Sequence, residues 1–388
     1  MTLTQEKLAQ AIDILQRSDV DTWMVFVRET SAGGDPVLPL ILNGGLTWTS
    51  ALIVTRDGGK FAVVGNYDAD PLIASGDWDE VVPYVQGIGP ELLRVLGAVP
   101  GPRIAINYSE NDVMADGLSH GLYLMLRRLL QGTSHELVSA EAIVGELRGV
   151  KTESEVRLIR EAIRETERIF REIPEVAQRG MSERALYDHI QGRMAERGLG
   201  YSWDKAGDPI VNFGPHSMIG HGIPRSDLYL EDGQILHIDL GVIREGYASD
   251  IQRCWFVGET VPEDVLRGLE AVNAAITAGS ELLRPGVRGV DVDAAARATI
   301  QRHGYPEYLH ALGHQVGRVA HDGGGLLGPA WDRYGDDPFK PVLEGQIYTL
   351  ELGVVLEGRG YLGIEEMVRV TADGIEWLTD RQLTMPTI

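Results

Sequence analysis

Gln234-Ile-Leu-His-Ile-Asp-Leu-Gly-Val-Ile243 is an apolar, β-prone run that carries one acidic residue, Asp239. The turn Arg244-Glu245-Gly246 follows, and Tyr247-Ala-Ser-Asp-Ile-Gln-Arg-Cys-Trp-Phe-Val257 is typical of the return strand of a hairpin. Folding the chain about this turn predicts that Asp239 and Asp250 lie close to opposite each other. Like charges that face each other across strands destabilise a sheet, so this acid pair needs an explanation.

A second hairpin downstream repeats the arrangement. Its first strand is Ile347-Tyr-Thr-Leu-Glu-Leu-Gly-Val-Val355, and its return strand is Tyr361-Leu-Gly-Ile-Glu-Glu-Met-Val-Arg-Val370. Glu351 and Glu365 are symmetric about Gly358, which predicts a second facing pair of carboxylates. Buried carboxylates are unfavourable unless they are protonated, paired with a cationic side chain or bound to a metal ion.

Two interpretations of the four acids follow. Nearby arginines could pair with them, and Arg244, Arg253 and Arg359 are available. Alternatively, the acids form a divalent-metal site, because carboxylate oxygens are hard ligands that such ions prefer. Histidines favour the second interpretation, since neutral imidazole suits Mn, Co, Fe or Zn. Four of them stand near glycines or near one another in the second half of the chain: His221, His310, His314 and His321.

The two hairpins lie in the second of two expected domains. A chain of 388 residues exceeds the length at which a single core usually stops growing. Residues 1–148 alternate strand-like and helical patterns, which indicates a small sheet flanked by helices. A boundary near Arg148–Lys151 separates them from residues 149–388, where Thr152 and Glu155 are spaced as a capping box. A second helix is expected from Ser182 to Gly198, and a strand-rich pattern after it.

Charge and composition exclude several functions. The chain has 57 acidic and 35 basic residues, a formal charge of −22, which argues against binding to nucleic acid or to anionic membranes. The single Cys254 cannot form an internal disulfide. The N-terminus has no secretory pattern, and no uncharged apolar stretch is long enough to cross a bilayer. These features predict a cytoplasmic protein.

The acids and one histidine together resemble the pita-bread metallopeptidases, a family that includes methionine aminopeptidase, Xaa-Pro aminopeptidase and Xaa-Pro dipeptidase, with creatinase as a metal-free relative. The order Asp239, Asp250, His314, Glu351, Glu365 is similar to the family pattern, as are the surrounding Gly246–Asp250 and Ile364–Val368. The resemblance implies an α+β fold: a pita-bread catalytic domain over residues 149–388, with a smaller α/β creatinase-type domain over residues 1–148. It also implies a homodimer.

The resemblance assigns roles to these residues. Two divalent ions, Mn before Co or Zn, would be bridged by Asp250 and Glu365. Asp239 would complete the coordination of one ion, and His314 with Glu351 would complete that of the other. Two such ions lower the pKa of a shared water, which supplies a bridging hydroxide near neutral pH. Glu351 is also expected to carry the proton from that water to the leaving nitrogen. The other three histidines are expected to contact substrate, two of them stabilising the tetrahedral intermediate: His221 and His321, with His310 beside them.

One departure from the family pattern leaves the substrate open. Members that cleave Xaa-Pro bonds usually have Arg two residues before the last ligand, where this chain has Gly363. Arg318 could replace the lost charge in substrate binding, or form an ordinary surface ion pair. The expected activity is hydrolysis of Xaa-Pro bonds in dipeptides or short peptides. The alternatives are an amidohydrolase of the same fold that acts on a non-peptide C–N bond, and a non-catalytic scaffold that binds partners.

A serine hydrolase is a further alternative, because Gly117-Leu118-Ser119-His120-Gly121 fits the nucleophile-elbow pattern. That elbow requires a strand that runs directly into it. Here the nearest expected strand ends near Tyr108, so this interpretation is disfavoured.

Overall fold

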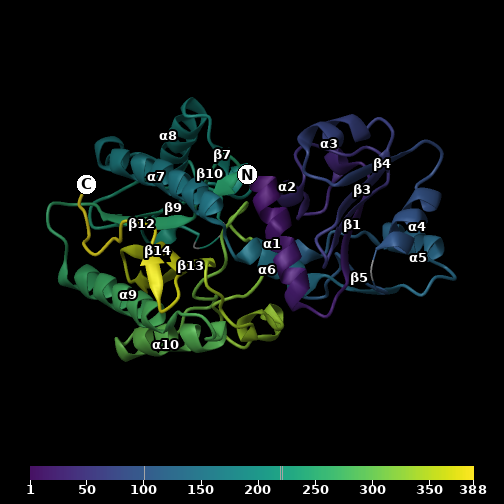
Figure 1. The fold of residues 1–388 in the computed structure, drawn as a ribbon. Coiled ribbons are helices and arrows are strands. Elements are labelled where there is room, and N and C mark those ends of the chain that lie inside the picture. The colour runs from purple at the N-terminus through teal and green to yellow at the C-terminus, as the bar shows by residue number, and fades with distance from the viewer. Residues whose placement is uncertain (100, 219, 221) are drawn as a thin grey trace. The chain divides into compact units, whose positions relative to one another are not determined.

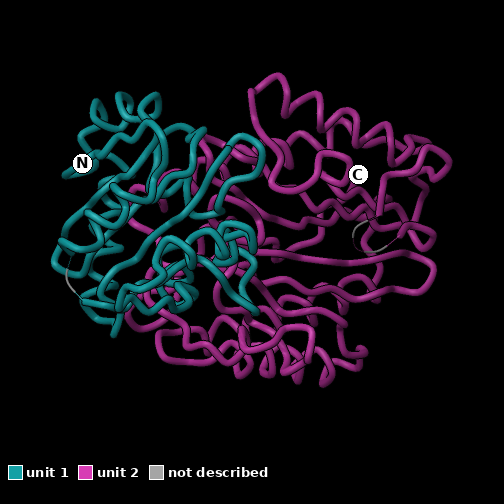
Figure 2. Tube along the Cα trace, turned by 90° about the vertical axis from the view of Figure 1, so that its right-hand side faces the viewer, with its two compact units in different colours: residues 1–148 teal, residues 149–388 magenta. Residues whose placement is uncertain are grey.

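The chain divides into two compact units in the computed structural model, residues Met1–Arg148 and Gly149–Ile388 (Figure 2). The structure describes residues 1–99, 101–218, 220 and 222–388. His221, one of the histidines expected to contact substrate, therefore lies outside the described residues.

The first unit is built on a mixed six-stranded sheet with the order β4-β3-β2-β1-β5-β6. Its strands are β1 (Thr22–Val27), β2 (Ser50–Thr55), β3 (Lys60–Gly65), β4 (Glu80–Tyr84), β5 (Arg103–Ile106) and β6 (Glu136–Ser139). Every residue of β1 is buried, because helices cover both faces of the sheet. This explains why the Trp23–Val27 run is continuously apolar rather than alternating.

Helices of the first unit pack on opposite faces of that sheet (Figure 1). One face is covered by α1 (Leu3–Arg17), α2 (Leu38–Ile41), α3 (Ala69–Ser75) and α6 (Glu141–Gly149), whose bounds reach one residue into the second unit. The other face is covered by α4 (Gly89–Ala98) and α5 (His120–Leu129). The α/β pattern predicted for this region is confirmed.

Four long helices belong to the second unit: α7 (Glu153–Val176), α8 (Glu183–Glu196), α9 (Glu263–Leu282) and α10 (Gly289–Arg302). The capping box predicted at the start of α7 is present, with Thr152 and Glu155 each bonded to the other's backbone. Ser182 caps α8 as predicted. The expectation of a strand-rich region after residue 201 is wrong in part, because α9 and α10 pack together against β13 and β14 and bury their apolar faces there.

The strands of the second unit form three antiparallel sheets of three strands each. Their orders are β11-β10-β7, β12-β9-β8 and β13-β14-β15. Their bounds are β7 (Gly200–Tyr201), β8 (Ile210–Phe213), β9 (Ile235–Leu240), β10 (Val242–Arg244), β11 (Tyr247–Ala248), β12 (Ile251–Phe256), β13 (Ile347–Leu356), β14 (Gly360–Val370) and β15 (Ile375–Trp377). Both predicted hairpins are present, and β12 packs beside β14, which brings the acids of the two hairpins together.

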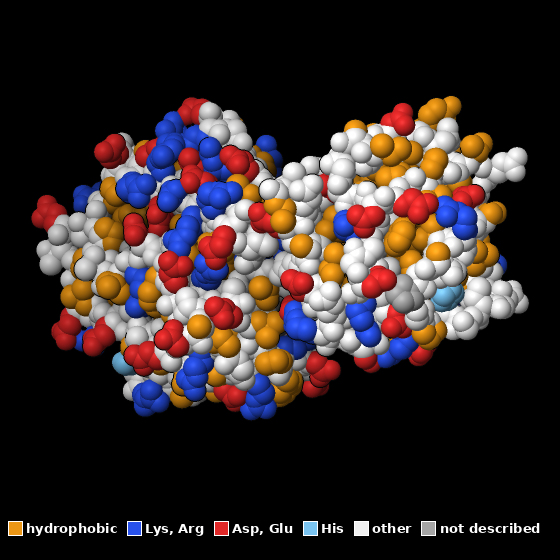
Figure 3. All heavy atoms as spheres, in the orientation of Figure 1, with side chains coloured by type: hydrophobic (Ala, Val, Ile, Leu, Met, Phe, Trp, Pro, Cys, Tyr) orange, Lys and Arg blue, Asp and Glu red, His pale blue; other side chains and the backbone are white. Residues whose placement is uncertain are grey.

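Charged side chains of both signs lie on the surface. On the face shown in Figure 3, basic and acidic side chains are intermixed rather than gathered by sign. Among the described residues, no helix combines the length and the apolar character that a bilayer-crossing segment requires.

Candidate active site

The second hairpin places two carboxylates directly opposite each other. Glu351 on β13 pairs in register with Glu365 on β14, as predicted from their symmetry about Gly358. Glu365 is 1% exposed and the Glu351 side chain is 20% exposed. One acid of the pair is therefore sealed from water, while the other remains accessible from solvent.

The first hairpin places its two acids on a diagonal rather than directly opposite. Asp239 pairs in register with Gln252, so Asp250 lies two residues further along the same face. The reason is the turn, which consists of two residues, Glu245 and Gly246, that both have positive φ, 50° and 78°. The centre of this turn lies one residue after the midpoint between Asp239 and Asp250 in the sequence. The carboxyl groups of Asp239 and Asp250 still lie within hydrogen-bond reach of each other.

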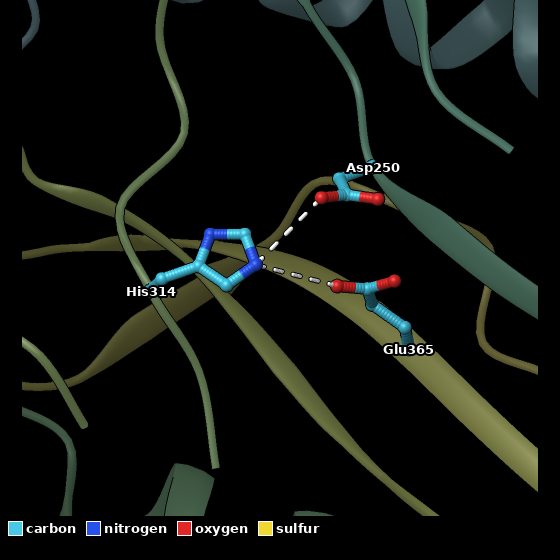
Figure 4. A group of neighbouring side chains, drawn as sticks. All are labelled: Asp250, His314 and Glu365. Atoms are coloured by element: carbon cyan, nitrogen blue, oxygen red, sulfur yellow. Dashed lines mark ion pairs between the residues drawn. The ribbon is translucent and has the colours of Figure 1, made fainter. Parts of the chain in front are cut away.

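His314 completes the group from a third segment. Its Nε2 lies 3.6 Å from Asp250 Oδ2, 3.5 Å from Glu351 Oε1 and 4.0 Å from Glu365 Oε1. Figure 4 shows the imidazole directed between the carboxyl groups of Asp250 and Glu365. These three residues have ligand atoms within 4.8 Å of one another, close enough for one ion. The structure thus brings together the four acids and the histidine that the sequence singled out.

The segment that carries His314 is held against β13 by backbone hydrogen bonds. Thr349 N donates to His314 O at 2.9 Å, and Glu351 N donates to Leu312 O at 2.7 Å. The imidazole is oriented by its other nitrogen, because Nδ1 lies 3.1 Å from the carbonyl oxygen of Ala320. This contact keeps Nε2 directed toward the carboxylates. Metal-binding histidines usually have such a second contact through the nitrogen that does not bind the metal.

Electrostatics in the group are unfavourable without a cation. Burial and then the neighbouring carboxylates raise the pKa values of Asp239, Asp250 and Glu365 well above their usual range. Burial, with the nearby His321, lowers the pKa of His314 to about 3, so its imidazole is neutral. A bound divalent cation reverses these shifts, because its charge favours ionised carboxylates and a neutral imidazole lone pair.

Two buried oxygens point to where cations fit. Among the described residues, Asp239 Oδ1 and Glu365 Oε1 have no hydrogen-bond partner. One belongs to each hairpin, and a buried carboxylate oxygen without a donor is rare in folded proteins. Together with the neutral Nε2 of His314, they form a donor set of hard oxygens and one nitrogen that fits Mn, Co or Zn.

The arginines that could have neutralised the acids are bonded elsewhere. Arg253 lies 2.8 Å from Glu366, and Arg244 lies 3.7 Å from Glu165. Arg359 pairs with Asp264 at 2.5 Å. None of these pairs involves the four site carboxylates, so the interpretation of the acids as partners of these arginines is wrong.

Sequence reasoning missed three residues behind the carboxylates. Gln252 Nε2 donates to Glu351 Oε2 at 2.9 Å and to Glu365 Oε2 at 3.1 Å. Its Oε1 lies 3.0 Å from His237 Nε2, and His237 Nδ1 lies 3.1 Å from Asn212 Oδ1. A signal existed in the sequence: Gln252 follows Asp250 by two residues and His237 precedes Asp239 by two. Residues two apart on a strand point to the same face, so each polar residue lies on the same face as its acid.

The remaining predicted residues surround the group less closely. The His321 ring is exposed and lies edge-on to His314, with centroids 4.3 Å apart. His310 Nδ1 is 2.7 Å from its neighbour's carbonyl oxygen, that of Ala311. Arg318 lies over the ring of Tyr247, 4.9 Å from its centroid, beside the turn of the first hairpin. The roles of these residues in substrate binding stay predictions.

The nucleophile-elbow pattern has a structural explanation. Ser119 is the N-cap of α5, and its hydroxyl accepts a hydrogen bond from Leu122 N at 3.3 Å. No strand leads directly into it, because β5 ends at Ile106. The serine is a helix cap, as its residue type favours.

Comparisons with known proteins agree with this geometry. A model of metallopeptidase family M24 matches residues 157–372. YqhT, an uncharacterized peptidase of Bacillus subtilis, is 29% identical over 267 residues, 68% of this chain and 71% of that protein. The Xaa-Pro dipeptidase of Pyrococcus furiosus is 30% identical over 246 residues, 63% of this chain and 67% of that protein. A solved Xaa-Pro dipeptidase from Bacillus anthracis has a TM-score of 0.76 at 21% identity, covering 99% of this chain and 100% of that one. These likenesses confirm the expected α+β pita-bread fold.

Proposed function

The chain belongs to metallopeptidase family M24, and on that premise we propose that it hydrolyses Xaa-Pro bonds of dipeptides or short peptides at a pair of divalent metal ions. The observation that carries the proposal is the group of four carboxylates around His314, which has no basic side chain to balance it among the described residues. The relative from Pyrococcus furiosus, which bears the name Xaa-Pro dipeptidase, supports the choice of bond.

Two ions can be held by the residues present. Asp250, from the first hairpin, and Glu365, from the second, would be the ligands that both ions share. Asp239, with its unpartnered Oδ1, would complete one site, and His314 with Glu351 would complete the other. Mn is the first choice, since four carboxylates and one imidazole form a hard donor set, with Co or Zn as alternatives.

When bound, such ions lower the pKa of a shared water and polarise the carbonyl of the scissile bond. The residues of the chain supply the rest. Glu351, the more accessible of the paired glutamates, takes a proton from the attacking water and passes it to the nitrogen that leaves as the C–N bond breaks. His321, exposed beside His314, donates a hydrogen bond to the developing oxyanion. His221 is proposed to share that role, and His310 to contact substrate.

Release of free amino acids from Ala-Pro in the presence of Mn(II) tests the proposal. Asp250→Asn should abolish the activity, and Glu351→Gln should lower kcat by about 10²–10⁴-fold, the usual contribution of a positioned general base. Glu357→Gln, which changes an exposed glutamate on the turn of the same hairpin, serves as the control and should keep full activity. Activity that survives both site variants would exclude this centre.

One observation favours a second candidate function. Gly363 provides no positive charge beside the site, so a metal-dependent amidohydrolase acting on a non-peptide C–N bond is the alternative. The two functions separate on a substrate panel: cleavage of simple amides, with no cleavage of any Xaa-Pro peptide, would favour the amidohydrolase.

We also propose that the protein is a homodimer, as the family resemblance implies. Each chain has a mass of 42.5 kDa, so light scattering should give about twice that value.

A further inference from the structure

The face that carries Glu351 and Glu365 continues into an unusual pair of glycines. Gly353 on β13 lies directly opposite Gly363 on β14. Side chains alternate along a strand, so both glycines share the face of the two glutamates. The site therefore has, next to its acids, a patch of bare backbone where side chains would ordinarily stand.

The Tyr361 ring covers this patch. A Cβ built on Gly353 would lie 2.4 Å from both Cζ and the hydroxyl oxygen of Tyr361, and a Cβ on Gly363 would lie 2.4 Å from its Cε1. His237 packs edge-on against the ring, with centroids 4.9 Å apart and planes at 85°. The two glycines are thus what allows the ring to lie flat on the sheet and lean toward Glu351.

The hydroxyl of Tyr361 is not used in a hydrogen bond within the described part of the protein. It lies over Gly353, two residues from Glu351, and forms no hydrogen bond with any residue that the structure describes. Burial, and then the charge of Glu351, raises the pKa of the phenol, which keeps the proton on its oxygen. The site therefore presents a neutral donor at this position.

Among the described residues, no lysine or arginine forms an ion pair with Glu351 or Glu365. A Cβ on Gly363 would also meet Gln252 Oε1 and His237 Nε2, both at 2.9 Å, so an amide and an imidazole complete the position beside the phenol. Arg359, two residues before Tyr361, is paired with Asp264, and Arg253, next to Gln252, is paired with Glu366. A substrate carboxylate placed here would face acids without a compensating guanidinium, whereas an amide carbonyl would find a donor.

We propose that Tyr361 determines which leaving group the site accepts. Its hydroxyl donates a hydrogen bond to the neutral carbonyl of the residue that follows the scissile bond. This inference rests on the proposed function, in which Glu351 delivers the proton to the leaving nitrogen and so places the leaving group on its own side. The protein then prefers peptides that continue as an amide beyond that residue over dipeptides that end there in a free carboxylate.

The test compares two substrates that differ only in that group, Ala-Pro-amide and Ala-Pro, with the full-length protein in Mn(II). We expect kcat/KM to be at least about 10-fold higher for the amide. Tyr361→Phe keeps the ring over the glycines and removes only the donor, so it should lower kcat/KM for the amide about 5- to 10-fold and leave Ala-Pro within about twofold. Tyr305→Phe, away from the site, is the matched control and should change neither.

A reversal of charge provides an independent arm. The double variant Tyr361→Gly with Gly363→Arg removes the ring and supplies a guanidinium, and it should shift the preference toward Ala-Pro. A wild-type preference for the free acid, or an equal effect of Tyr361→Phe on both substrates, would overturn the inference. If neither compound is hydrolysed, the proposed function fails. Equilibrium binding of the same two compounds then tests the role of Tyr361. The inference requires that Tyr361→Phe binds the amide more weakly than the wild type does, and unchanged binding would refute it.

Discussion

At the scale of single residues, Gln252 is the group on which the arrangement of the paired glutamates depends. Its side-chain amide donates to one oxygen of Glu351 and one of Glu365, so it holds both Oε2 atoms and leaves both Oε1 atoms on the side of His314. His237 in turn holds Gln252. A hydrogen bond of this kind fixes a ligand's orientation before the metal arrives.

Gln252→Ala should therefore weaken Mn(II) binding about 10-fold or more, as loss of such a supporting contact usually does. Titration calorimetry on metal-free protein measures the change. Gln346→Ala, which removes another buried glutamine bonded to Leu343 and Tyr348 rather than to the carboxylates, is the control. Equal affinities of the two variants would contradict the role given to Gln252.

The acids themselves could be predicted from the sequence because they break a pattern, being charges within apolar strands. The spacing of Gln252 and His237 from the acids is a weaker signal, since a polar residue on a strand face is common and only its partners reveal its role. The register of the first hairpin could not be predicted, because it depends on the positive φ of Glu245 in the turn. A non-glycine residue in that conformation is uncommon, so the sequence alone pointed to a longer turn.

At the scale of elements, the strand-like segment around His314 has no room for a larger residue at Gly313. A Cβ there would lie 1.9 Å from the carbonyl oxygen of Thr349, which is backbone and cannot move without displacing β13. Gly313 also exchanges hydrogen bonds with Leu327 on its other side. The residue is therefore confined between two segments, and His314 follows it directly.

Gly313→Ala should lower the free energy of unfolding by about 2 kcal/mol or more, within the range for a steric overlap in a packed interior. It should also reduce Mn(II) occupancy, because His314 moves with its neighbour. Chemical denaturation and metal analysis measure the two effects. Gly192→Ala is the matched control: it lies within α8 with open space around its Cβ, and should stabilise the protein by about 0.5–1 kcal/mol. If Gly313→Ala were as stable as the control, the close contact with β13 would not exist.

Helices were predicted unevenly, for physical reasons. The starts of α7 and α8 carry side-chain caps, which are local signals. The spacing of Val265, Leu269, Val272 and Ile276 is also helical, but Pro262, the N-cap residue of α9, forms no side-chain capping hydrogen bond. Its neighbour α10 begins at a glycine and contains β-branched residues, and its packing against α9 stabilises it more than its intrinsic propensity does.

At the scale of the whole molecule, the proposed metal centre combines acids from two hairpins, and 90 residues separate β12 from β13 in the chain. The formal charge is −22, and two divalent ions would change it to −18 by neutralising the four acids of the site. The sequence predicts a boundary near Arg148–Lys151, before the capping box, and the two compact units are Met1–Arg148 and Gly149–Ile388. Assignment of the first unit to a creatinase-type role in the enzyme stays a proposal.

Binding of metal should stabilise the folded protein, because an unfolded chain offers no preformed site. At a free Mn(II) concentration of 100 times Kd, linkage gives about 2.7 kcal/mol of added stability per site. Thermal unfolding should occur at a higher temperature in Mn(II) than in a chelator, and Asp250→Asn should abolish the difference. An Mn(II)-dependent shift of the same size in that variant would place the ion elsewhere.

The most direct test of the account is a count of ions. Calorimetric titration of chelator-treated, metal-free protein with Mn(II) should reach two ions per chain, and neither Asp250→Asn nor Glu365→Gln should reach that number. Wild-type protein that binds no Mn(II), Co(II) or Zn(II), or two ions bound undiminished in both variants, would contradict the claim that these carboxylates form the catalytic metal centre.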